Sequence, residues 1–409
     1  MSTAADFTHI ARQPILDARG QVYGYELLFR ASRDATSFEE PGNASARLIS
    51  DAVTGPGFDA LSDGKRVFLN MSADVLLSDV SGLFDPERVV LEIPSDLVVG
   101  DAVAAMCAKL HQHGHALALD GFSAGAPAAS LLAHARFAKV DVLDTPLEDV
   151  AAITADLLAR GLTVIAERVE TEEALQAAKA AGCSLFQGYY FCRPQTVSVK
   201  AMAANQLTQM QLLAALMRPN VPLADVEELL KRDTTLSYRV LRTVNSAGFG
   251  LRREIGSIRE ALLMLGLDQV RKWASLWTLA SLNKGPSELL TMTIVRARTC
   301  ETVGQALGRA EQGYFLLGMC SLLDALLGQP MDKVVAELPV TAEIRGALLG
   351  EANHARQVLD AVARYERADW LEASNAAAAA GLDEDTLPQA YFDALAWART
   401  VTQAAGKAA

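Results

Sequence analysis

Six short apolar segments in the first half of the chain each carry a polar residue at or near their end. The segments are 66–70, 89–93, 116–120, 137–141, 163–167 and 184–188. The polar residues are Asn70, Glu92, Asp120, Lys139, Glu167 and Gln187. If the segments are parallel strands of one barrel, their carboxyl ends meet at one mouth, where barrel enzymes place their chemistry. Carboxylate and amide oxygens suit Mg²⁺ or Mn²⁺, so the set predicts a metal-dependent site. The alternative is that each polar residue only marks a strand end.

The elements that would position these residues follow from the spacing of apolar side chains. Stretches between the segments, such as 101–113 and 171–181, repeat apolar residues every three or four positions, which is typical of amphipathic helices. Alternation of strands and helices predicts a parallel sheet, and this number of units in under 200 residues predicts a small TIM-like (β/α) barrel.

The second half of the chain shows no strand pattern and is predicted to be all-α. Helices are predicted over 203–217, 223–232, 235–246, 257–265, 268–282, 288–308 and 312–327, with further ones to about 404. Ser257 and Glu260 form a capping box at the start of one helix, and Gly266 suits its left-handed exit. We therefore expect a barrel over residues 1–197 and an all-α domain over residues 198–409.

The composition limits the classes of partner. The 409 residues carry a formal net charge of −12, which argues against a basic surface for duplex nucleic acid. No stretch approaches the roughly 18 apolar residues that span a bilayer, and no secretory signal opens the chain. Five cysteines without a C-x-x-C pair favour reduced thiols. We expect a cytoplasmic protein with no membrane partner.

A series of short motifs occurs in a fixed order along the barrel half. The first is Glu26, Leu27, Leu28, Phe29 and Arg30, and the others are FLNMSADVL, VVLEIP, LALDGF, AKVD, VIAERVETEEAL and QGYYFCRP. In order and spacing they resemble the EAL family of cyclic dimeric GMP (cyclic di-GMP) phosphodiesterases, whose signature is glutamate, alanine, leucine, any residue, arginine. The resemblance covers nearly the whole predicted barrel and implies its fold.

The resemblance also implies a role for each site residue. Glu26, Asn70, Glu92 and Asp120 would be ligands of Mg²⁺ or Mn²⁺. Lys139 and Glu167 would position or activate water, Gln187 would support the site and contact the ligand, and Arg30 would hold a ligand phosphate. Two such ions can clamp the attacking and leaving oxygens of a phosphodiester.

The sequence departs from the family pattern at three loops of the predicted mouth. Gly121 follows Asp120 where active members carry a second aspartate, so the second metal loses a carboxylate. Ser95 stands where the family has a second glutamate after Glu92, and Arg168 replaces the small residue that usually follows the glutamate at 167. We expect one metal site rather than two and vestigial or slow hydrolysis, because removing one key electrostatic group costs about 10²–10³ in rate.

The helical half resembles HDOD domains, relatives of metal-dependent HD phosphohydrolases. The residues that carry the resemblance are Asp233, Asn245, Ser246, Gly248 and Gly266. An HD hydrolase needs a His-Asp pair, but the corresponding stretch reads GMCSLLDALL, with Asp324 and no histidine before it. We expect no metal in this half and a regulatory role through a protein partner.

Three functions remain open from the sequence. The barrel binds cyclic di-GMP or serves as a scaffold around it, with little or no hydrolysis, and the helical half relays to a protein partner. Alternatively, it is an active metal-dependent phosphodiesterase that makes the linear dinucleotide pGpG. In the third reading it is an interaction scaffold without ligand. A homodimer is left open, because the loop after Glu92, near which active relatives pair, is altered.

Overall fold

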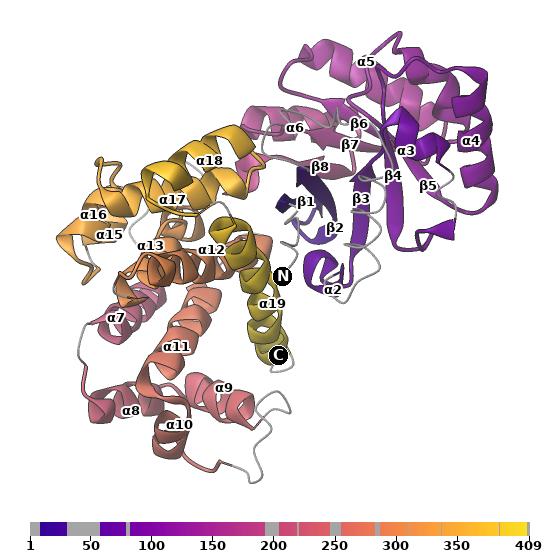
Figure 1. The fold of residues 1–409 in the computed structure, drawn as a ribbon. Coiled ribbons are helices and arrows are strands. Elements are labelled where there is room, and N and C mark those ends of the chain that lie inside the picture. Colours follow the sequence, from indigo (N-terminus) through magenta and orange to yellow (C-terminus); the bar gives the residue numbers. More distant parts are fainter. Residues whose placement is uncertain are drawn as a thin grey trace, which may run out of the picture. The chain divides into compact units, whose positions relative to one another are not determined.

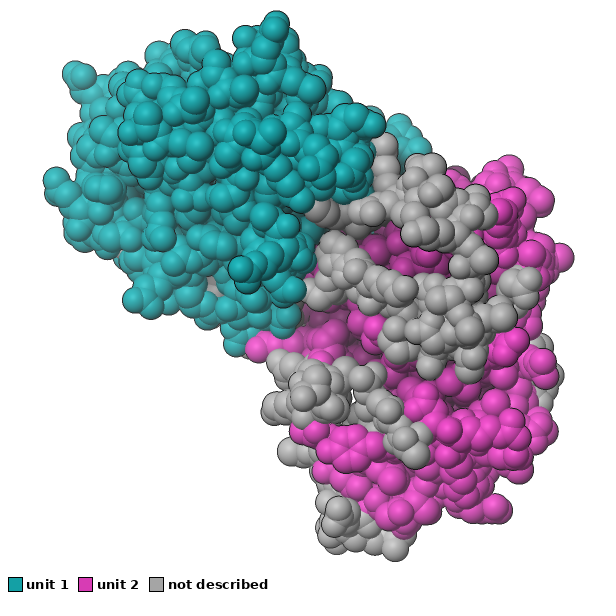
Figure 2. Space-filling model, turned by 180° about the vertical axis from the view of Figure 1, so that it is seen from behind, with its two compact units in different colours: residues 1–192, 363–375 teal, residues 193–362, 376–409 magenta. Residues whose placement is uncertain are grey.

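The structure is a computed structural model that describes residues 9–30, 58–78, 82–192, 204–218, 221–245, 255–282, 287–309, 311–336, 338–383 and 385–406. Its contacts divide the chain into two compact units (Figure 2). Unit 1 comprises Met1–Cys192 with Ala363–Asn375, and unit 2 comprises Arg193–Val362 with Ala376–Ala409. The boundary predicted at residue 197 stays a prediction, because residues 193–203 lie outside the described residues.

Unit 1 contains an eight-stranded closed barrel (Figure 1). Its strands are β1 (His9–Asp17), β2 (Val22–Arg30), β3 (Arg66–Asn70), β4 (Val89–Pro94), β5 (Ala116–Asp120), β6 (Phe137–Asp141), β7 (Thr163–Glu167) and β8 (Leu185–Gln187). The six predicted segments are thus six of the strands. The helices of this unit are α2 (Phe58–Ser62), α3 (Ala73–Leu77), α4 (Asp101–Gln112), α5 (Leu147–Ala159) and α6 (Glu172–Ala181). Helices α4 to α6 lie outside the strands (Figure 1).

The barrel differs in one respect from the expected all-parallel sheet. Strands β2 to β8 are parallel neighbours, but β1 runs antiparallel to both β2 and β8. The reason is local, because β1 and β2 are joined by a tight turn at residues 18–21 rather than by a crossover helix. Since β1 closes the barrel, the carboxyl ends of the other seven strands still meet at one mouth.

A layer of apolar side chains fills the part of the barrel interior that lies away from the carboxyl ends of strands β2 to β8. Its buried members are Ile15, Phe68, Val90, Ala116, Ala118, Phe137, Ile165 and Leu185. The rings of Phe68 and Phe137 meet edge to face with centroids 5.5 Å apart, and Tyr23 packs against both. Such an interdigitated layer makes the barrel a solid core rather than a pore.

Unit 2 is helical where it is described. From α7 to α13 its helices are α7 (Ala204–Met217), α8 (Leu223–Arg232), α9 (Thr234–Val244), α10 (Ile258–Leu265), α11 (Leu267–Leu282), α12 (Ser287–Ala306) and α13 (Glu311–Cys320). The later ones are α14 (Leu323–Leu327), α15 (Met331–Ala336), α16 (Ala342–Leu348), α17 (His354–Tyr365), α18 (Trp370–Ala379) and α19 (Thr386–Gly406), of which α17 and α18 extend into unit 1. The predicted helix 312–327 is two helices, α13 and α14. None of the helices in the described part of the chain combines the length and apolarity of a membrane span.

Candidate functional site

The candidate site is the inward-facing layer that follows the apolar layer toward the mouth. Side chains two positions apart on a strand face the same side of the sheet. The residue two positions beyond each of six members of the apolar layer therefore also faces the barrel interior. These six members are Phe68, Val90, Ala118, Phe137, Ile165 and Leu185. The residues two positions beyond them are Asn70, Glu92, Asp120, Lys139, Glu167 and Gln187. Strand register brings Asn70 opposite Glu92 on the neighbouring strand. The predicted residues therefore converge at one mouth.

Lys139 occupies the centre of this layer. Its side chain is 1% exposed, and its Nζ lies 2.7 Å from Glu26 Oε2, 3.0 Å from Glu92 Oε1 and 3.0 Å from Asp120 Oδ1. The Glu167 carboxylate is more distant, at 3.7 Å. One buried lysine thus lies among four carboxyl groups. Its single positive charge does not neutralise the cluster, which can accept further positive charge.

Glu26 connects the cluster to the amide side chains. Its Oε1 accepts a hydrogen bond from Asn70 Nδ2 at 2.8 Å, and its Oε2 accepts from Lys139 Nζ and from Gln187 Nε2, each at 2.7 Å. Gln187 Nε2 also donates to Gln13 Oε1 at 3.1 Å. Gln13, on β1, was not predicted as part of the site. Gln13 stands between Arg12 and Pro14, so no isolated polar position marked it in the sequence, and its place follows from the register that pairs it with Glu26.

The charges of the cluster shift its pKa values in opposite directions. Burial raises the pKa of Glu92 well above its usual range, and the nearby Glu26 carboxylate adds to the effect. Burial alone would raise the pKa of Glu26, but Lys139 and the hydrogen bonds hold it below its ordinary value. Burial would lower the pKa of Lys139, and the surrounding carboxylates, Glu26 first, raise it well above its usual range instead. Lys139 is therefore a permanent cation.

Glu167 differs from the other carboxylates because it titrates near neutrality. Burial, followed by repulsion from Asp120, raises the pKa of Glu167 to about 8. A carboxyl group whose pKa lies near the working pH suits proton transfer.

The oxygen donors of the cluster are of the kind that hard divalent cations prefer. Glu92 Oε2 is buried and has no hydrogen-bond partner among the described residues, and Glu92 Oε1 and Asp120 Oδ1 have only their ion-pair contacts with Lys139. Together with Asn70 they form an all-oxygen donor set of the kind that Mg²⁺ and Mn²⁺ prefer. The described residues contain no group of three or more acidic, histidine or cysteine side chains arranged as metal ligands. In the barrel mouth, Lys139 Nζ lies among the carboxylates.

Two of the departures from the family pattern touch each other. The Ser95 hydroxyl donates a hydrogen bond to the Gly121 carbonyl oxygen at 2.6 Å, and the Ser95 N–H donates to the Asp120 carbonyl at 2.9 Å. Gly121 itself has φ +62°, a left-handed conformation that glycine adopts freely. The loops after β4 and β5 are thus joined by the Ser95 hydroxyl and the Ser95 N–H.

Arg168 connects two other loops of the mouth. It has φ +55°, and its guanidinium donates to Asp141 Oδ2 at 2.6 Å and to the Asp144 carboxylate. Left-handed backbone is unfavourable for a side chain of this size, so the loop after β7 is locally strained. The charge is held at the rim and about half exposed rather than directed into the carboxylate cluster.

Of the remaining predicted residues, three cap or join helices in unit 2, and the others lie outside the described residues. The Arg30 side chain, Ser246 and Gly248 lie outside the described residues. Asp233 caps α9 by accepting the Leu236 N–H at 3.0 Å, and Gly266 has φ +83° between α10 and α11. Asn245 Nδ2 donates to the Ile255 carbonyl at 2.8 Å, and Asn245 Oδ1 accepts the Ile255 N–H at 2.7 Å.

An arginine lies beside the position expected for a His-Asp pair in unit 2. Arg296 is 3% exposed, and its Nη1 donates to Ser321 Oγ at 3.1 Å. Its charge also acts on Asp324, whose pKa is raised by burial and lowered in part by Arg296. The guanidinium supplies positive charge here from within the protein.

Fold and site together define a (β/α) barrel with an acidic, lysine-centred mouth, joined to a helical unit. The EAL domain model matches residues 66–194, and the HDOD domain model matches residues 205–329. The chain is 32% identical to the uncharacterized protein YuxH of Bacillus subtilis, over 97% of this chain and 99% of the relative. It is 30% identical to the cyclic di-GMP phosphodiesterase CdgJ of Vibrio cholerae, over 97% of this chain and 93% of the relative.

Among solved structures, a manganese and cyclic di-GMP complex of Klebsiella pneumoniae BlrP1 is 24% identical, with a TM-score of 0.39 over 47% of this chain and 56% of that chain. The family of this chain is shown by the two domain models and by the relatives that it matches over nearly their whole length. The chain belongs to the EAL–HDOD family.

Proposed function

We propose that this chain is a cyclic di-GMP signalling protein whose barrel binds the dinucleotide with one divalent ion and hydrolyses it slowly or not at all. The observation that carries the proposal is the retained carboxylate cluster around Lys139 beside a glycine, Gly121, that offers no ligand. The relative CdgJ, which covers nearly the whole chain, is named a cyclic di-GMP phosphodiesterase and supports the choice of ligand.

Each side chain of the site has a distinct part in this function. Asn70, Glu92 and Asp120, with Glu26, would hold the ion, which when bound neutralises charge on the ligand phosphate. Lys139 fixes the carboxylates in one cluster and, with Glu167, orients water. Gln187 holds Glu26 in place through its amide. By resemblance to the EAL family, Arg30 would hold a ligand phosphate. A protein partner of the helical half would receive the signal.

The second candidate function is rapid hydrolysis of cyclic di-GMP to pGpG. The raised pKa of Glu167, about 8, favours it, because this value suits a general base or acid near neutral pH. Against it stands the loss of acidic side chains at both Ser95 and Gly121. In phosphoryl chemistry each such group stabilises charge that develops in the transition state.

The two functions are separated by measuring binding and turnover on the same preparation. Calorimetry of the full chain with cyclic di-GMP and Mn²⁺ or Mg²⁺ should show binding, and chromatography should show little linear product. Glu26→Gln, which keeps the shape of the side chain and removes its charge, should abolish the binding. Robust hydrolysis that Glu26→Gln removes would favour the phosphodiesterase. No binding with either ion would leave the barrel as a scaffold without ligand.

A further inference from the structure

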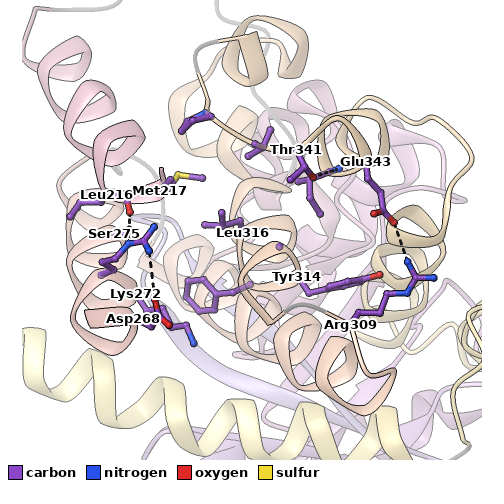
Figure 3. A pocket seen from close by; sticks show the side chains of 16 residues that line it. Leu216, Met217, Asp268, Lys272, Ser275, Arg309, Tyr314, Leu316, Thr341 and Glu343 are labelled. Atoms are coloured by element: carbon purple, nitrogen blue, oxygen red, sulfur yellow. Dashed lines mark hydrogen bonds and ion pairs between the residues drawn. The ribbon is translucent and has the colours of Figure 1, made fainter. Parts of the chain in front are cut away.

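Unit 2 contains a cavity that the barrel chemistry does not use (Figure 3). Its volume is about 420 Å³, within the size range of sites for small organic molecules. The walls come from α7, α11, α13 and the start of α16. The segment 339–344, which leads into α16, lies beyond the range 205–329 that matches the HDOD model, whereas the other walls fall within that range.

Most of the cavity wall is apolar. Leu216, Met217, Phe315 and Ile344 each expose 4% or less of their surface, and Leu316 lies between the two sides of the cavity in Figure 3. A concave site of this composition favours a ligand with an apolar body, because contact removes apolar surface from water on both partners.

The α11 side of the cavity carries positive charge. Arg271 is held by its Nε, which donates to the Leu216 carbonyl at 2.8 Å, and by Nη2, which donates to the Arg218 carbonyl at 2.6 Å. Its Nη1 has a loose ion pair with Asp268, at 3.5 Å, and the Asp268 side chain is 56% exposed. The guanidinium is therefore fixed in orientation, while its charge is only weakly neutralised.

The neighbouring lysine adds to this charge. Lys272 pairs with Glu301, which is fully buried and also accepts from Arg298 Nη1 at 2.7 Å. One carboxylate thus serves two cations. The three cations Arg271, Lys272 and Arg298 face two carboxylates, those of Asp268 and Glu301, so this side of the cavity has one excess positive charge within a chain whose formal net charge is −12.

Ser275 supplies an unused hydrogen-bond donor on the same helix. It lines the cavity one turn from Arg271 and is 3% exposed. No hydrogen bond joins its hydroxyl to any other residue in the described ranges, and because Ser275 lines the cavity the hydroxyl is available to a molecule bound there. The opposite side of the cavity carries the exposed pair Arg309 and Glu343, 3.7 Å apart, whose charges cancel. Its hydroxyls are already engaged, since Thr341 Oγ1 accepts the Ile344 N–H at 3.3 Å and the Tyr314 hydroxyl lies 2.9 Å from His354 Nδ1.

We propose that this cavity binds an amphipathic monoanion, an acyl chain with a carboxylate head, whose carboxylate lies at Ser275, Arg271 and Lys272 and whose chain lies against Leu316 and Phe315. The apolar wall accounts for the chain, and the net positive side with its free hydroxyl accounts for the head. The proposal concerns unit 2 alone and is independent of the ligand of the barrel.

Three probes of equal chain length test the proposal on the full chain. Calorimetry with decanoate, decanol and decylamine, below their micelle concentrations, should give binding in that order, with decanoate at least about tenfold tighter than decanol. Equal binding of decanol would mean an unspecific apolar cavity and overturn the proposal. Tighter binding of decylamine, or no binding of decanoate, would overturn it as well.

Ser275→Ala tests the head group without altering the packing. Removing an unpaired buried hydroxyl should leave the melting temperature unchanged or higher, and decanoate binding should weaken about tenfold while decanol binding stays constant. Gly313→Leu should fill the cavity and abolish binding of both, since a Cβ there meets only Ile344 at 3.8 Å. Gly256→Leu, at an exposed loop position with no neighbour within 4 Å, is the matched control. Unchanged decanoate binding in Ser275→Ala would contradict the placement.

Discussion

A Cβ atom on Gly121 would lie 3.9 Å from Oε1 of Glu167, which is ordinary contact distance. The loop after β5 therefore has room for a side chain directed at the carboxylate cluster, and its left-handed φ of +62° is one that aspartate and asparagine tolerate better than most residues. That position 121 presents no side chain to the cluster is thus a property of the residue type and not of a closed backbone.

Restoring that group should raise activity. We expect Gly121→Asp to increase cyclic di-GMP hydrolysis with Mn²⁺ by about 10²-fold, because it returns a ligand oxygen to the site. Gly121→Asn is the matched control, with the same shape and no charge, and should stay near the parent rate. Linear product formation measures both. Equal rates in Gly121→Asp and the parent, with folding intact, would show that Gly121 is not what limits turnover.

Lys139 should be essential for the stability of the barrel. Lys139→Met leaves four carboxylates without their buried cation, and removing one partner of a buried ion pair costs about 3–5 kcal/mol. The loss should shrink as pH falls, since protonation relieves the repulsion. Urea unfolding at pH 8 and pH 5.5 measures it. Lys65→Met, at an exposed lysine, should change little at either pH.

Glu167 should make the metal-free chain less stable at high pH. Its folded pKa of about 8 lies above its ordinary value of 4.5, so between these values the folded state binds more protons than the unfolded state. The free energy of unfolding should therefore fall as pH rises through this window. In Glu167→Gln, measured in chelator, that part of the decline should be absent. A decline of the same size in Glu167→Gln would assign the titration to other groups.

Asn245 should stabilise unit 2 through its two hydrogen bonds to Ile255. Asn245→Ala removes both, so we expect a loss of about 1–3 kcal/mol in the free energy of unfolding. Asn245→Asp keeps the acceptor and loses the donor, so its free energy of unfolding should lie between those of Asn245→Ala and the parent. Chemical denaturation of the full chain gives the order. An Asn245→Ala variant as stable as the parent would mean that the ends of segment 246–254 are held by other contacts.

The sequence by itself determined the strands and the set of residues that face the barrel mouth. Period-2 burial fixes which side of a strand each residue occupies, so Asn70, Glu92, Asp120, Lys139 and Glu167 are inward-facing once the strands are recognised. The domain models confirmed the EAL and HDOD assignments. These assignments could be made from the sequence because the motifs that carry them are local in the chain. The roles of the site residues stay predictions.

Only the tertiary structure decided which groups pair across strands. That Lys139 balances four carboxylates, that Ser95 bonds the carbonyl of Gly121, and that Gln13 joins the site depend on neighbours far apart in the chain. The pairing of β1 with β8, which closes the barrel, and the cavity beside Ser275, which helix packing creates, depend in the same way on distant segments. Side-chain periodicity reports the face of an element, whereas distances between elements follow from how those faces pack.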